Sequence, residues 1–230
     1  MTDHPRADIA VLADDPVKNH PTRGEQLDIL ASLAADLLKP GDSLIDLGVG
    51  VGYVARMIAA RVPDLEFTGI DLKPASLAEA RACLSPLVGK LCLVEGDLNA
   101  LDSLAVPGGT FRCAVSVLTF HDLPDDAKRR AIAWIARHLQ PGGVFLFLDR
   151  VRLDEAALFP LQVSLWNRMT RVYGASMRRA DTYEDYLADL TATNRVARFK
   201  DYLSWFAAEG LAADCIHRHG NIALFGAAKT

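Results

Sequence analysis

The hydrophobic residues of this chain follow two patterns that alternate along its first two thirds. Short, nearly continuous apolar segments are typical of strands buried on both faces of a parallel sheet. Between them, apolar residues recur every three or four positions, as on one face of a helix. The predicted strands are 43–47, 65–71, 90–95, 111–118 and 144–148. This alternation predicts a parallel sheet with right-handed helical crossovers.

Local signals mark where several of the predicted helices begin and end. Thr22 and Glu25 have the spacing of a capping box, so we expect the first helix to begin there. Pro74 occupies the first position of the helix that follows the second strand. The helix after the fourth strand begins at Pro124 and ends at the Gln-Pro-Gly-Gly sequence of residues 140–143.

The alternation stops after the fifth strand. Residues 153–193 show helical periodicity and no strand pattern, which predicts a helical insert or lid. One helix of this region would end at Gly174, and Asp181 with Glu184 would cap the next. Asn194 would cap a third helix, which follows the insert.

Two predicted strands complete the chain, at 211–217 and 221–229. The turn between them, at His219-Gly220, is too short for a crossover, so these strands should form an antiparallel hairpin. We therefore expect one domain over residues 1–230, with an N-terminal arm at 1–21 that has no clear periodicity.

Composition narrows the class of protein. The chain has 230 residues, half of them hydrophobic, and a net charge of −4, which suits one globular domain and gives no sign of a nucleic-acid surface. The N-terminus has no apolar signal core, and no apolar run is long enough to span a membrane. The four cysteines match no zinc-site spacing. We expect a cytoplasmic protein whose thiols are reduced and buried.

The candidate chemistry begins at the turn after the first strand, which contains Gly48, Gly50 and Gly52. Glycines let a ligand approach the backbone, and the following helix directs its free N–H groups at the turn, so a carboxylate or phosphate is the expected guest. The dinucleotide fingerprint requires a small residue where this chain has Tyr53, which disfavours NAD. Asp46 would either cap the turn or contact the ligand.

Acidic or polar residues follow each of the five predicted strands. Because the carboxyl ends of parallel strands meet at one edge of the sheet, these residues predict a single site. They are Asp46, Asp71, Gly96-Asp97, residues 119–122 and Asp149. An acid in the position of Asp71 can accept both hydroxyls of a ribose. Asp97 is a candidate for ligand contact or for a plain turn cap.

His121 and Asp122 admit two interpretations. A histidine beside an aspartate can act as a general base. Alternatively, Asp122 caps the helix that begins at Pro124, and His121 packs on the ligand. His217 and His219 would project to one side of a strand, as a metal pair does, but with no third ligand nearby we expect a solvated hairpin end and no metal site.

The Asp-x-Gly-x-Gly-x-Gly sequence that starts at Asp46 resembles motif I of the class I S-adenosylmethionine (SAM)-dependent methyltransferases. Asp71, Gly96-Asp97, the Gln-Pro-Gly-Gly sequence and the terminal hairpin also resemble this family, so the resemblance covers most of the chain. It implies an α/β fold: a Rossmann-like three-layer sandwich around a seven-stranded, mostly parallel sheet with an antiparallel last strand and a helical insert after strand five. SAM would be the cofactor.

The resemblance also implies roles for individual residues. The glycines would approach the methionine part of SAM, and Asp71 would hold its ribose hydroxyls. Asp97 would accept from the adenine amino group, with Leu98 against the ring, and His121 would line the sulfonium and substrate pocket. The full set of implied cofactor contacts is Asp46, Gly48, Gly50, Gly52, Asp71, Leu72, Asp97, Leu98 and Thr119.

The C-terminal half resembles one branch of the family, the carboxy-SAM synthases, which convert SAM and prephenate to carboxy-SAM for tRNA wobble-uridine modification. The shared features are the insert and an ending similar to Trp-Phe-x-x-x-Gly…Asn-Ile-x-x-Phe-Gly-x-x-x-Lys. Val117 replaces an asparagine of that branch, and Glu184 replaces the arginine that holds the added carboxylate. Arg178, Arg179 and Arg195 lie nearby in the sequence. We expect ordinary methyl transfer.

These observations predict an enzyme that methylates a small molecule, and the arginines of the insert favour an anionic one. Candidate substrate contacts are Trp166, Tyr173, Arg178 and Arg179, and candidate catalytic residues are His121 and Asp122. The alternatives are a carboxy-SAM synthase, a non-catalytic SAM-binding module and an NAD-dependent reductase. The apolar insert helices would suit a homodimer interface, and we expect no direct contact with nucleic acid.

Overall fold

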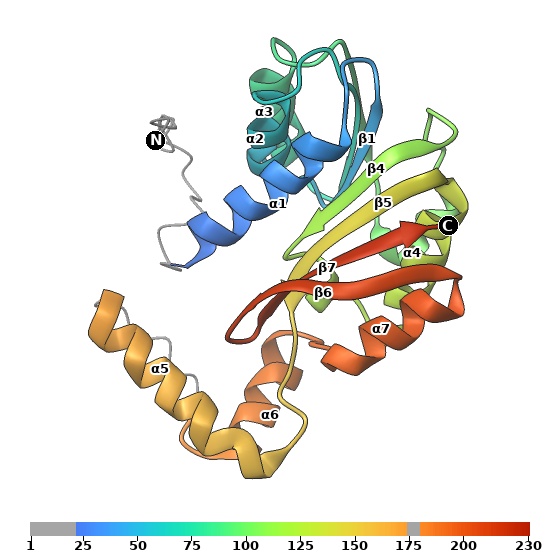
Figure 1. The fold of residues 1–230 in the computed structure, drawn as a ribbon. Helices are drawn as coiled ribbons and strands as arrows, with labels where there is room; N and C mark the ends of the chain where they lie inside the picture. The colour runs from blue at the N-terminus through green and yellow to red at the C-terminus, as the bar shows by residue number, and fades with distance from the viewer. Residues whose placement is uncertain (1–21, 174–179) are drawn as a thin grey trace.

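A seven-stranded sheet forms the centre of the computed structural model, which describes residues 22–173 and 180–230 (Figure 1). The strand order is β3-β2-β1-β4-β5-β7-β6, and β7 runs antiparallel to both of its neighbours. The strands are β1 Ser43–Leu47, β2 Glu66–Asp71, β3 Lys90–Glu95, β4 Phe111–Val117, β5 Leu139–Arg150, β6 Leu211–His219 and β7 Ile222–Lys229. The predicted mixed sheet with its antiparallel last strand is confirmed.

Helices cover both faces of the sheet and form the outer layers. The α-helices are α1 Arg23–Leu37, α2 Tyr53–Ala59, α3 Pro74–Leu84, α4 Asp125–His138, α5 Phe159–Tyr173, α6 Tyr183–Thr193 and α7 Phe199–Ala208. Three 3₁₀ turns complete the described elements: η1 Leu98–Ser103, η2 Phe120–Asp122 and η3 Ala156–Leu158. Helices α1, α2 and α3 pack on one face, and α4 and α7 pack on the other (Figure 1).

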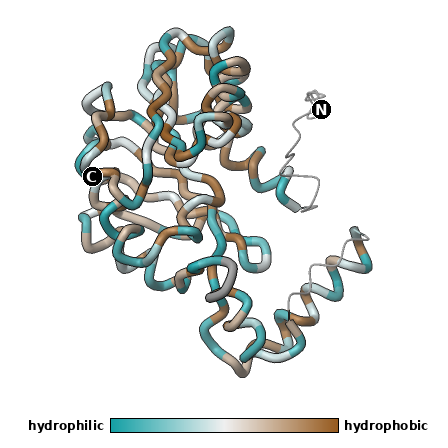
Figure 2. Tube along the Cα trace, turned by 180° about the vertical axis from the view of Figure 1, so that it is seen from behind, coloured by the Kyte–Doolittle hydropathy of each residue, from teal (hydrophilic) through white to brown (hydrophobic). Residues whose placement is uncertain are grey.

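Each central strand contributes alternate residues to two separate hydrophobic cores. Phe145 and Phe147 of β5 pack with α4 and α7, whereas Leu146 and Leu148 pack with α1 and its neighbours. Successive side chains of a strand point to opposite faces, so a strand covered on both sides must be apolar throughout. Figure 2 shows hydrophobic residues concentrated along these strands. This double coverage explains the continuous apolar runs of the sequence.

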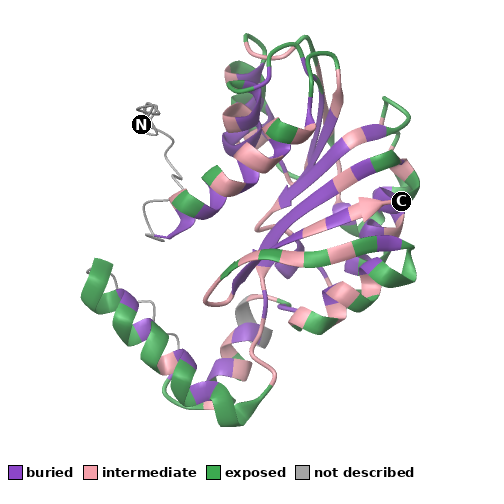
Figure 3. Ribbon diagram, in the orientation of Figure 1, coloured by how far each residue is buried: buried purple, intermediate pink, exposed green. Residues whose placement is uncertain are grey.

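The helical insert leaves the sheet at the carboxyl end of β5 and has a small core of its own (Figures 1 and 3). Phe159 and Trp166 of α5 pack on Tyr186 and Leu190 of α6. Helix α5 also exposes several apolar side chains: Leu161, Leu165, Val172 and Tyr173. The insert is therefore an appendage with limited burial of its own.

Several predicted boundaries were wrong. Strand β5 begins at Leu139, because the Gln-Pro-Gly-Gly sequence joins the strand instead of only ending α4. Helix α6 is capped by Thr182, whose hydroxyl accepts from the Asp185 N–H at 3.1 Å, and not by Asp181. Asn194 ends α6 and does not cap α7, which begins five residues later at Phe199.

Two further expectations met different outcomes. Thr22 does precede α1, but its side chain makes no capping hydrogen bond. All four cysteines are free thiols, yet Cys113 alone is fully buried, so the expectation of buried thiols was wrong for the other three.

The N-terminal arm and Gly174 lie outside the described residues. Within the described ranges, no helix is long and apolar enough to cross a membrane.

Candidate functional site

The turn between β1 and α2 is built by glycines in the left-handed region of backbone space. Gly48, Gly50 and Gly52 have φ values of 84°, 54° and 81°. The N–H groups of Gly48 and Val49 donate to the Ile70 carbonyl at 2.8 and 3.0 Å, which fixes the turn against β2. Side chains with a Cβ adopt such backbone angles at a cost, so the turn requires glycine.

The three glycines face different surroundings. A Cβ on Gly48 would lie 2.2 Å from the Thr119 hydroxyl oxygen, so this position also needs glycine for close packing on β4. A Cβ on Gly52 would meet Cys83 of α3 at 3.0 Å. Gly50 has nothing within 4 Å of that position. Gly50 is thus the glycine that leaves open space, whereas Gly52 serves helix packing and does not line the cavity described below.

Asp71 braces this turn from the end of β2. Its Oδ2 accepts from the Gly50 N–H at 2.8 Å, and its Oδ1 accepts from the Lys73 N–H at 2.9 Å. Both oxygens keep further acceptor capacity. The Asp71 carboxylate therefore connects the end of β2 to the turn that follows β1, two points that the sequence predicted to lie at one edge of the sheet.

A cavity with two adjoining compartments, here called the turn cavity, opens at the carboxyl ends of β1, β2 and β4. The compartments have volumes of about 540 and 280 Å³ and share Gly48, Gly50 and Val117 in their walls. The larger contains the predicted residues Asp71, Leu72, Asp97, Leu98, Thr119 and Asp122. The smaller contains Asp46, Arg23 and Leu27. The expected clustering at one edge of the sheet is present.

Asp97 lines the cavity and caps a turn at the same time. Its Oδ1 accepts from both the backbone and the side-chain nitrogen of Asn99, at 2.8 and 2.7 Å, at the start of η1. Asp97 is therefore the N-cap residue of η1, as one of the two interpretations predicted. Its Oδ2 takes part in neither of these two hydrogen bonds. Leu98 beside it is buried, and Leu72 across the cavity is exposed.

The smaller compartment holds two buried ionisable groups, one acidic and one basic. Asp46 is 3% exposed, and its Oδ1 has no hydrogen-bond partner among the described residues. Arg23 is 8% exposed, and its Nε and Nη2 also lack a partner there. Burial, aided by Asp71, raises the pKa of Asp46 to about 8. Burial, aided by Arg150, lowers the pKa of Arg23 to about 10. Unpartnered buried groups of this kind are costly unless a ligand satisfies them.

His121 is held by a carboxylate that the sequence did not connect to it. Asp149 is fully buried at the end of β5, and its Oδ1 lies 2.5 Å from Nδ1 of His121. Its Oδ2 accepts from the His121 backbone N–H at 2.8 Å. An ionised carboxylate at Nδ1 requires the proton there, which leaves the lone pair on Nε2. Nε2 lies 3.7 Å from Asp122 Oδ1.

Asp122 joins the site to the segment that follows the insert. Its Oδ1 accepts from the Asn194 side chain at 3.1 Å, and the Arg195 N–H donates to the His121 carbonyl at 2.6 Å. The buried Lys128 of α4 donates to the Arg195 carbonyl and to Asp125. The alternative in which Asp122 caps α4 is contradicted, because Pro124 occupies the cap position and Asp122 faces Asn194.

A second cavity, here called the insert cavity, lies between the insert and the β6–β7 hairpin and has a volume of about 470 Å³. Its apolar walls include Trp166 and Met169 of α5. Its ionisable lining comprises Arg150, Arg168, Asp189, Arg218 and His219. None of the described residues lines both this cavity and the turn cavity, but lining residues of the two are neighbours at two points: Thr22 precedes Arg23 in the chain, and Asn194 is hydrogen bonded to Asp122.

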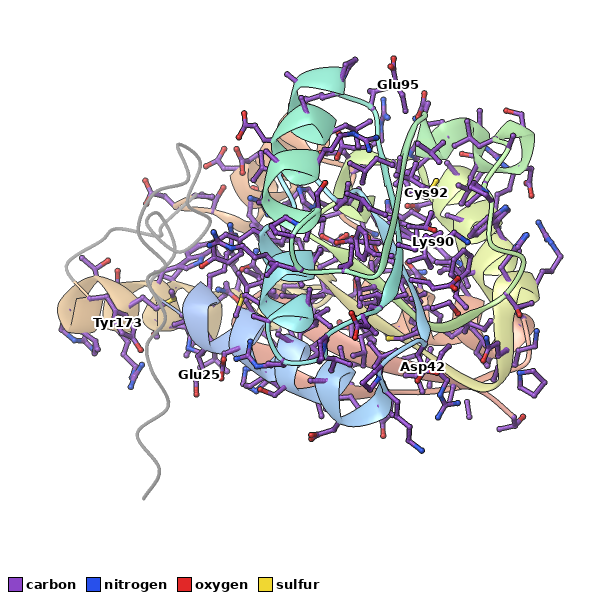
Figure 4. The ribbon with its side chains drawn as sticks, turned by 90° about the horizontal axis from the view of Figure 1, so that it is seen from above. Glu25, Asp42, Lys90, Cys92, Glu95 and Tyr173 are labelled. Atoms are coloured by element: carbon purple, nitrogen blue, oxygen red, sulfur yellow. The ribbon has the colours of Figure 1, made fainter. Side chains whose placement is uncertain are left out.

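Of the four predicted substrate contacts, the structure describes two, and one of these lines the insert cavity. Trp166 lines the insert cavity. Tyr173, at the end of α5, is exposed and lines none of the cavities described here. It lies on the same side of the molecule as Glu25 of α1 and away from the β3 residues Lys90 and Glu95 (Figure 4). Arg178 and Arg179 lie outside the described residues.

Comparison with known proteins identifies the family that shares this arrangement. Residues 44–143, which contain the glycine turn and β1–β4, match the sequence profile of a methyltransferase domain. The chain belongs to the class I SAM-dependent methyltransferases. The family and its carboxy-SAM synthase relatives imply SAM as the cofactor.

The relatives of this methyltransferase differ in what they act on. A carboxy-S-adenosyl-L-methionine synthase of Chromohalobacter salexigens is 31% identical over 155 residues, covering 64% of this chain and 54% of its own. A trans-aconitate 2-methyltransferase of Streptomyces avermitilis is 31% identical over 188 residues, covering 81% of this chain and 63% of its own. The chain thus spans between half and two thirds of the length of these two curated relatives.

Solved structures share the fold of this methyltransferase at low identity. An O-methyltransferase family protein from Burkholderia thailandensis superimposes with a TM-score of 0.66 at 18% identity, covering 94% of this chain and 58% of that one. The match supports the sheet order described above.

Four residues of the methyltransferase site were missed or unassigned by sequence reasoning. Arg23 was not among the predicted site residues, because it follows a predicted helix cap directly and an arginine at that position gives no signal of a binding site. Asp149 was noted only as a strand end, and Asn194 only as a cap. Leu118 lines both compartments of the turn cavity with a φ of 53°, and nothing in the sequence signals this unusual backbone.

Proposed function

We propose that this methyltransferase transfers the methyl group of SAM to a small anionic acceptor. The observation that carries the proposal is the pair of adjoining cavities. The first combines an open glycine, acidic strand ends and two buried ionisable groups with unpartnered atoms. The second is lined by arginines and aromatic residues. A cofactor cavity beside a substrate cavity is the arrangement that group transfer requires.

The residues of the turn cavity fit SAM part by part. Asp71 would accept the ribose hydroxyls, and Asp97 with Leu98 would take the adenine. Asp46 and Arg23 would pair with the ammonium and the carboxylate of the methionine end. An acidic and a basic group, both buried and both with unpartnered atoms, suit a zwitterion, whose ammonium would favour the ionised form of Asp46. Gly50 leaves the space that the ligand would occupy.

When bound, SAM supplies an electrophilic methyl group, so the chain has to align the acceptor and exclude water. Correct alignment of two reactants contributes about 7–11 kcal/mol to such a reaction. A base is needed only when the acceptor carries a proton at working pH. His121, held by Asp149 with its lone pair on Nε2, would be that base. Its Nε2 lies near Asp122 and hence near the border between the two cavities.

Carboxy-SAM synthesis is the second candidate, because a carboxy-SAM synthase is among the relatives at 31% identity. Two placements favour methyl transfer instead. Val117 puts an apolar side chain into the wall of both turn-cavity compartments. Glu184 is exposed on α6 and does not line the insert cavity, so it offers no carboxylate clamp.

Native mass spectrometry of the freshly purified protein, followed by denaturation, tests the proposal first. Bound SAM or S-adenosylhomocysteine supports it, whereas bound NAD would contradict it. Incubation with SAM and prephenate then separates the candidates, since carboxy-SAM has its own mass. Formation of S-adenosylhomocysteine with a panel of small acids completes the test. SAM binding without turnover on such a panel would support a non-catalytic module.

The cytoplasmic location and the homodimer stay predictions.

A further inference from the structure

The insert cavity concentrates positive charge in a chain whose net charge is −4. Arg150 comes from the end of β5, Arg168 from α5 and Arg218 from β6, so guanidinium groups enter from three different elements. Asp189 is the one acidic side chain among the described lining residues, so the lining has an excess of positive charge. The excess of positive charge around the cavity favours an anionic occupant.

The contacts of Arg168 and Arg218 leave these two arginines suited to an external anion. Arg168 is exposed and has no acidic partner among the described residues. Arg218 places its guanidinium 5.6 Å from the Phe199 ring centroid and donates from Nε to the Gly220 carbonyl at 2.9 Å, which holds the group in place. Guanidinium forks bind carboxylate and phosphate groups in a bidentate manner.

Arg150 lies near a second positive charge, that of Arg23. It donates from Nη1 to the Asn194 side chain and lies close enough to Arg23 to help lower the pKa of that residue. Two like charges on either side of a cavity border repel each other until an anion lies between them. An anionic ligand beside Arg150 in the insert cavity would offset part of this repulsion.

The other walls of the cavity are apolar and partly aromatic. Trp166 and Tyr186 lie side by side with ring centroids 6.1 Å apart, and Met169 and Ile222 also line the space. A cavity of about 470 Å³ has the size of a small-molecule site. Such walls would bury a planar, unsaturated body, while the arginines reach its charged ends.

We propose that the insert cavity binds a small acid with two or more anionic groups, carboxylate or phosphate, on a planar apolar body. A single carboxylate occupies one guanidinium fork, whereas arginines from three elements match separated anionic groups. The inference rests on the proposed function, because it takes this acid as the methyl acceptor. It goes further in naming the class of acid and in assigning recognition to Arg168 and Arg218.

The test uses calorimetry on the full chain saturated with S-adenosylhomocysteine. The probes are isophthalate, citrate and phenyl phosphate, with the neutral isophthalamide as the matched control ligand. We expect at least one anionic probe to bind about tenfold or more tightly than isophthalamide. The strongest probe distinguishes a carboxylate from a phosphate site and an aromatic from an aliphatic body.

Variants assign the binding to the cavity. Arg168→Gln and Arg218→Gln should each weaken the strongest anionic probe by about tenfold to a hundredfold, the usual effect of losing a charge-assisted hydrogen bond. Their affinity for S-adenosylhomocysteine should stay unchanged, which also shows that they fold. Arg137→Gln is the matched control, because Arg137 pairs with Asp102 on the surface of α4 and is outside the cavity.

The possible outcomes separate the two proposals. If S-adenosylhomocysteine binds but every anionic probe binds no better than isophthalamide, the inference is overturned and the proposed function stands. Equal weakening by Arg137→Gln, or unchanged anion affinity in both cavity variants, would also overturn it. If S-adenosylhomocysteine does not bind at all, the proposed function fails and this inference fails with it.

Discussion

Asp71 and Asp46 lie at the ends of neighbouring strands and serve different purposes. Asp71 is engaged by two backbone N–H groups, so its charge is stabilised by the turn that it braces. Asp46 has a buried oxygen without a partner, and its pKa is raised to about 8. Residues that look equivalent in a motif therefore differ in their hydrogen-bond partners, and each leads to a separate prediction.

Replacing Asp71 should weaken cofactor binding more than it weakens the fold. Asp71→Ala removes the proposed acceptor of two ribose hydroxyls, and hydrogen bonds to charged groups contribute about 1.5–3 kcal/mol each. We expect calorimetry to show at least a tenfold loss in S-adenosylhomocysteine affinity. Asp42→Ala is the control, since Asp42 lies at the amino end of β1, far from the turn cavity (Figure 4). Equal affinities for both variants would disprove the assigned ribose position.

Asp46 should make the ligand-free protein less stable as pH rises. Its pKa in the folded state, about 8, is above the unfolded value of 3.8, so the folded state binds the additional proton between these limits. The free energy of unfolding should therefore fall from about pH 4 to about pH 8 through this residue. Asp46→Asn should remove that slope in urea denaturation measured at several pH values. A variant with the wild-type slope would contradict the burial of this charge.

The strands and the start of α3 could be predicted from the sequence, whereas the helix caps near the insert and the contact between His121 and Asp149 could not. The strands were predictable because burial on both faces forces continuous apolar runs, and Pro74 correctly marked the start of α3. Helix caps near the insert were not predictable, because Asp181 and Thr182 are both good cap residues and tertiary packing decides between them. Asp149 and His121 meet through pairing of β4 with β5, which sequence spacing does not reveal.

The glycine turn should respond differently to alanine at its two positions. Gly50→Ala faces open space, so its cost is the left-handed backbone alone, about 1–2 kcal/mol of stability. Gly48→Ala adds a collision with the Thr119 side chain, and overpacking costs about 1–3 kcal/mol more. Urea denaturation should rank Gly48→Ala as less stable. Gly50→Ala should keep its fold and lose cofactor affinity; retained affinity would argue against a ligand over Gly50.

The junction of β4 and β5 should fix the tautomer of His121. Asp149→Asn exchanges the carboxylate at Nδ1 for an amide, which no longer requires the proton on that nitrogen. Nitrogen-15 NMR of the imidazole should show protonated Nδ1 in the wild type and a mixture of tautomers in the variant. Asp122→Asn is the control and should keep the wild-type pattern, because Asp122 is 3.7 Å from Nε2. The same mixture in the wild type would exclude the positioning role.

The whole molecule consists of a doubly covered sheet that carries a smaller, separately packed insert. The two main cores are shared by all central strands, whereas the insert core is confined to α5, α6 and adjoining residues. The turn cavity is lined by the ends of sheet strands and by residues of α1–α3, and the insert cavity is lined by both parts. Residues of the insert line the insert cavity and not the turn cavity, so a change confined to the insert should alter the first cavity and spare the second.

Removing Trp166 should therefore loosen the insert and spare the rest of the molecule. Trp166→Ala deletes a buried ring that packs on Phe159 and Tyr186, a change that costs about 3–5 kcal/mol in a well-packed core. Because the insert core is small, this loss should appear as local opening. Hydrogen exchange should quicken in α5 and α6, while β4 and β5 keep their protection. Leu161→Ala on the exposed face of the same helix should change neither region. Binding of S-adenosylhomocysteine should persist in Trp166→Ala, and faster exchange throughout the sheet would show that the insert and the sheet unfold as one unit.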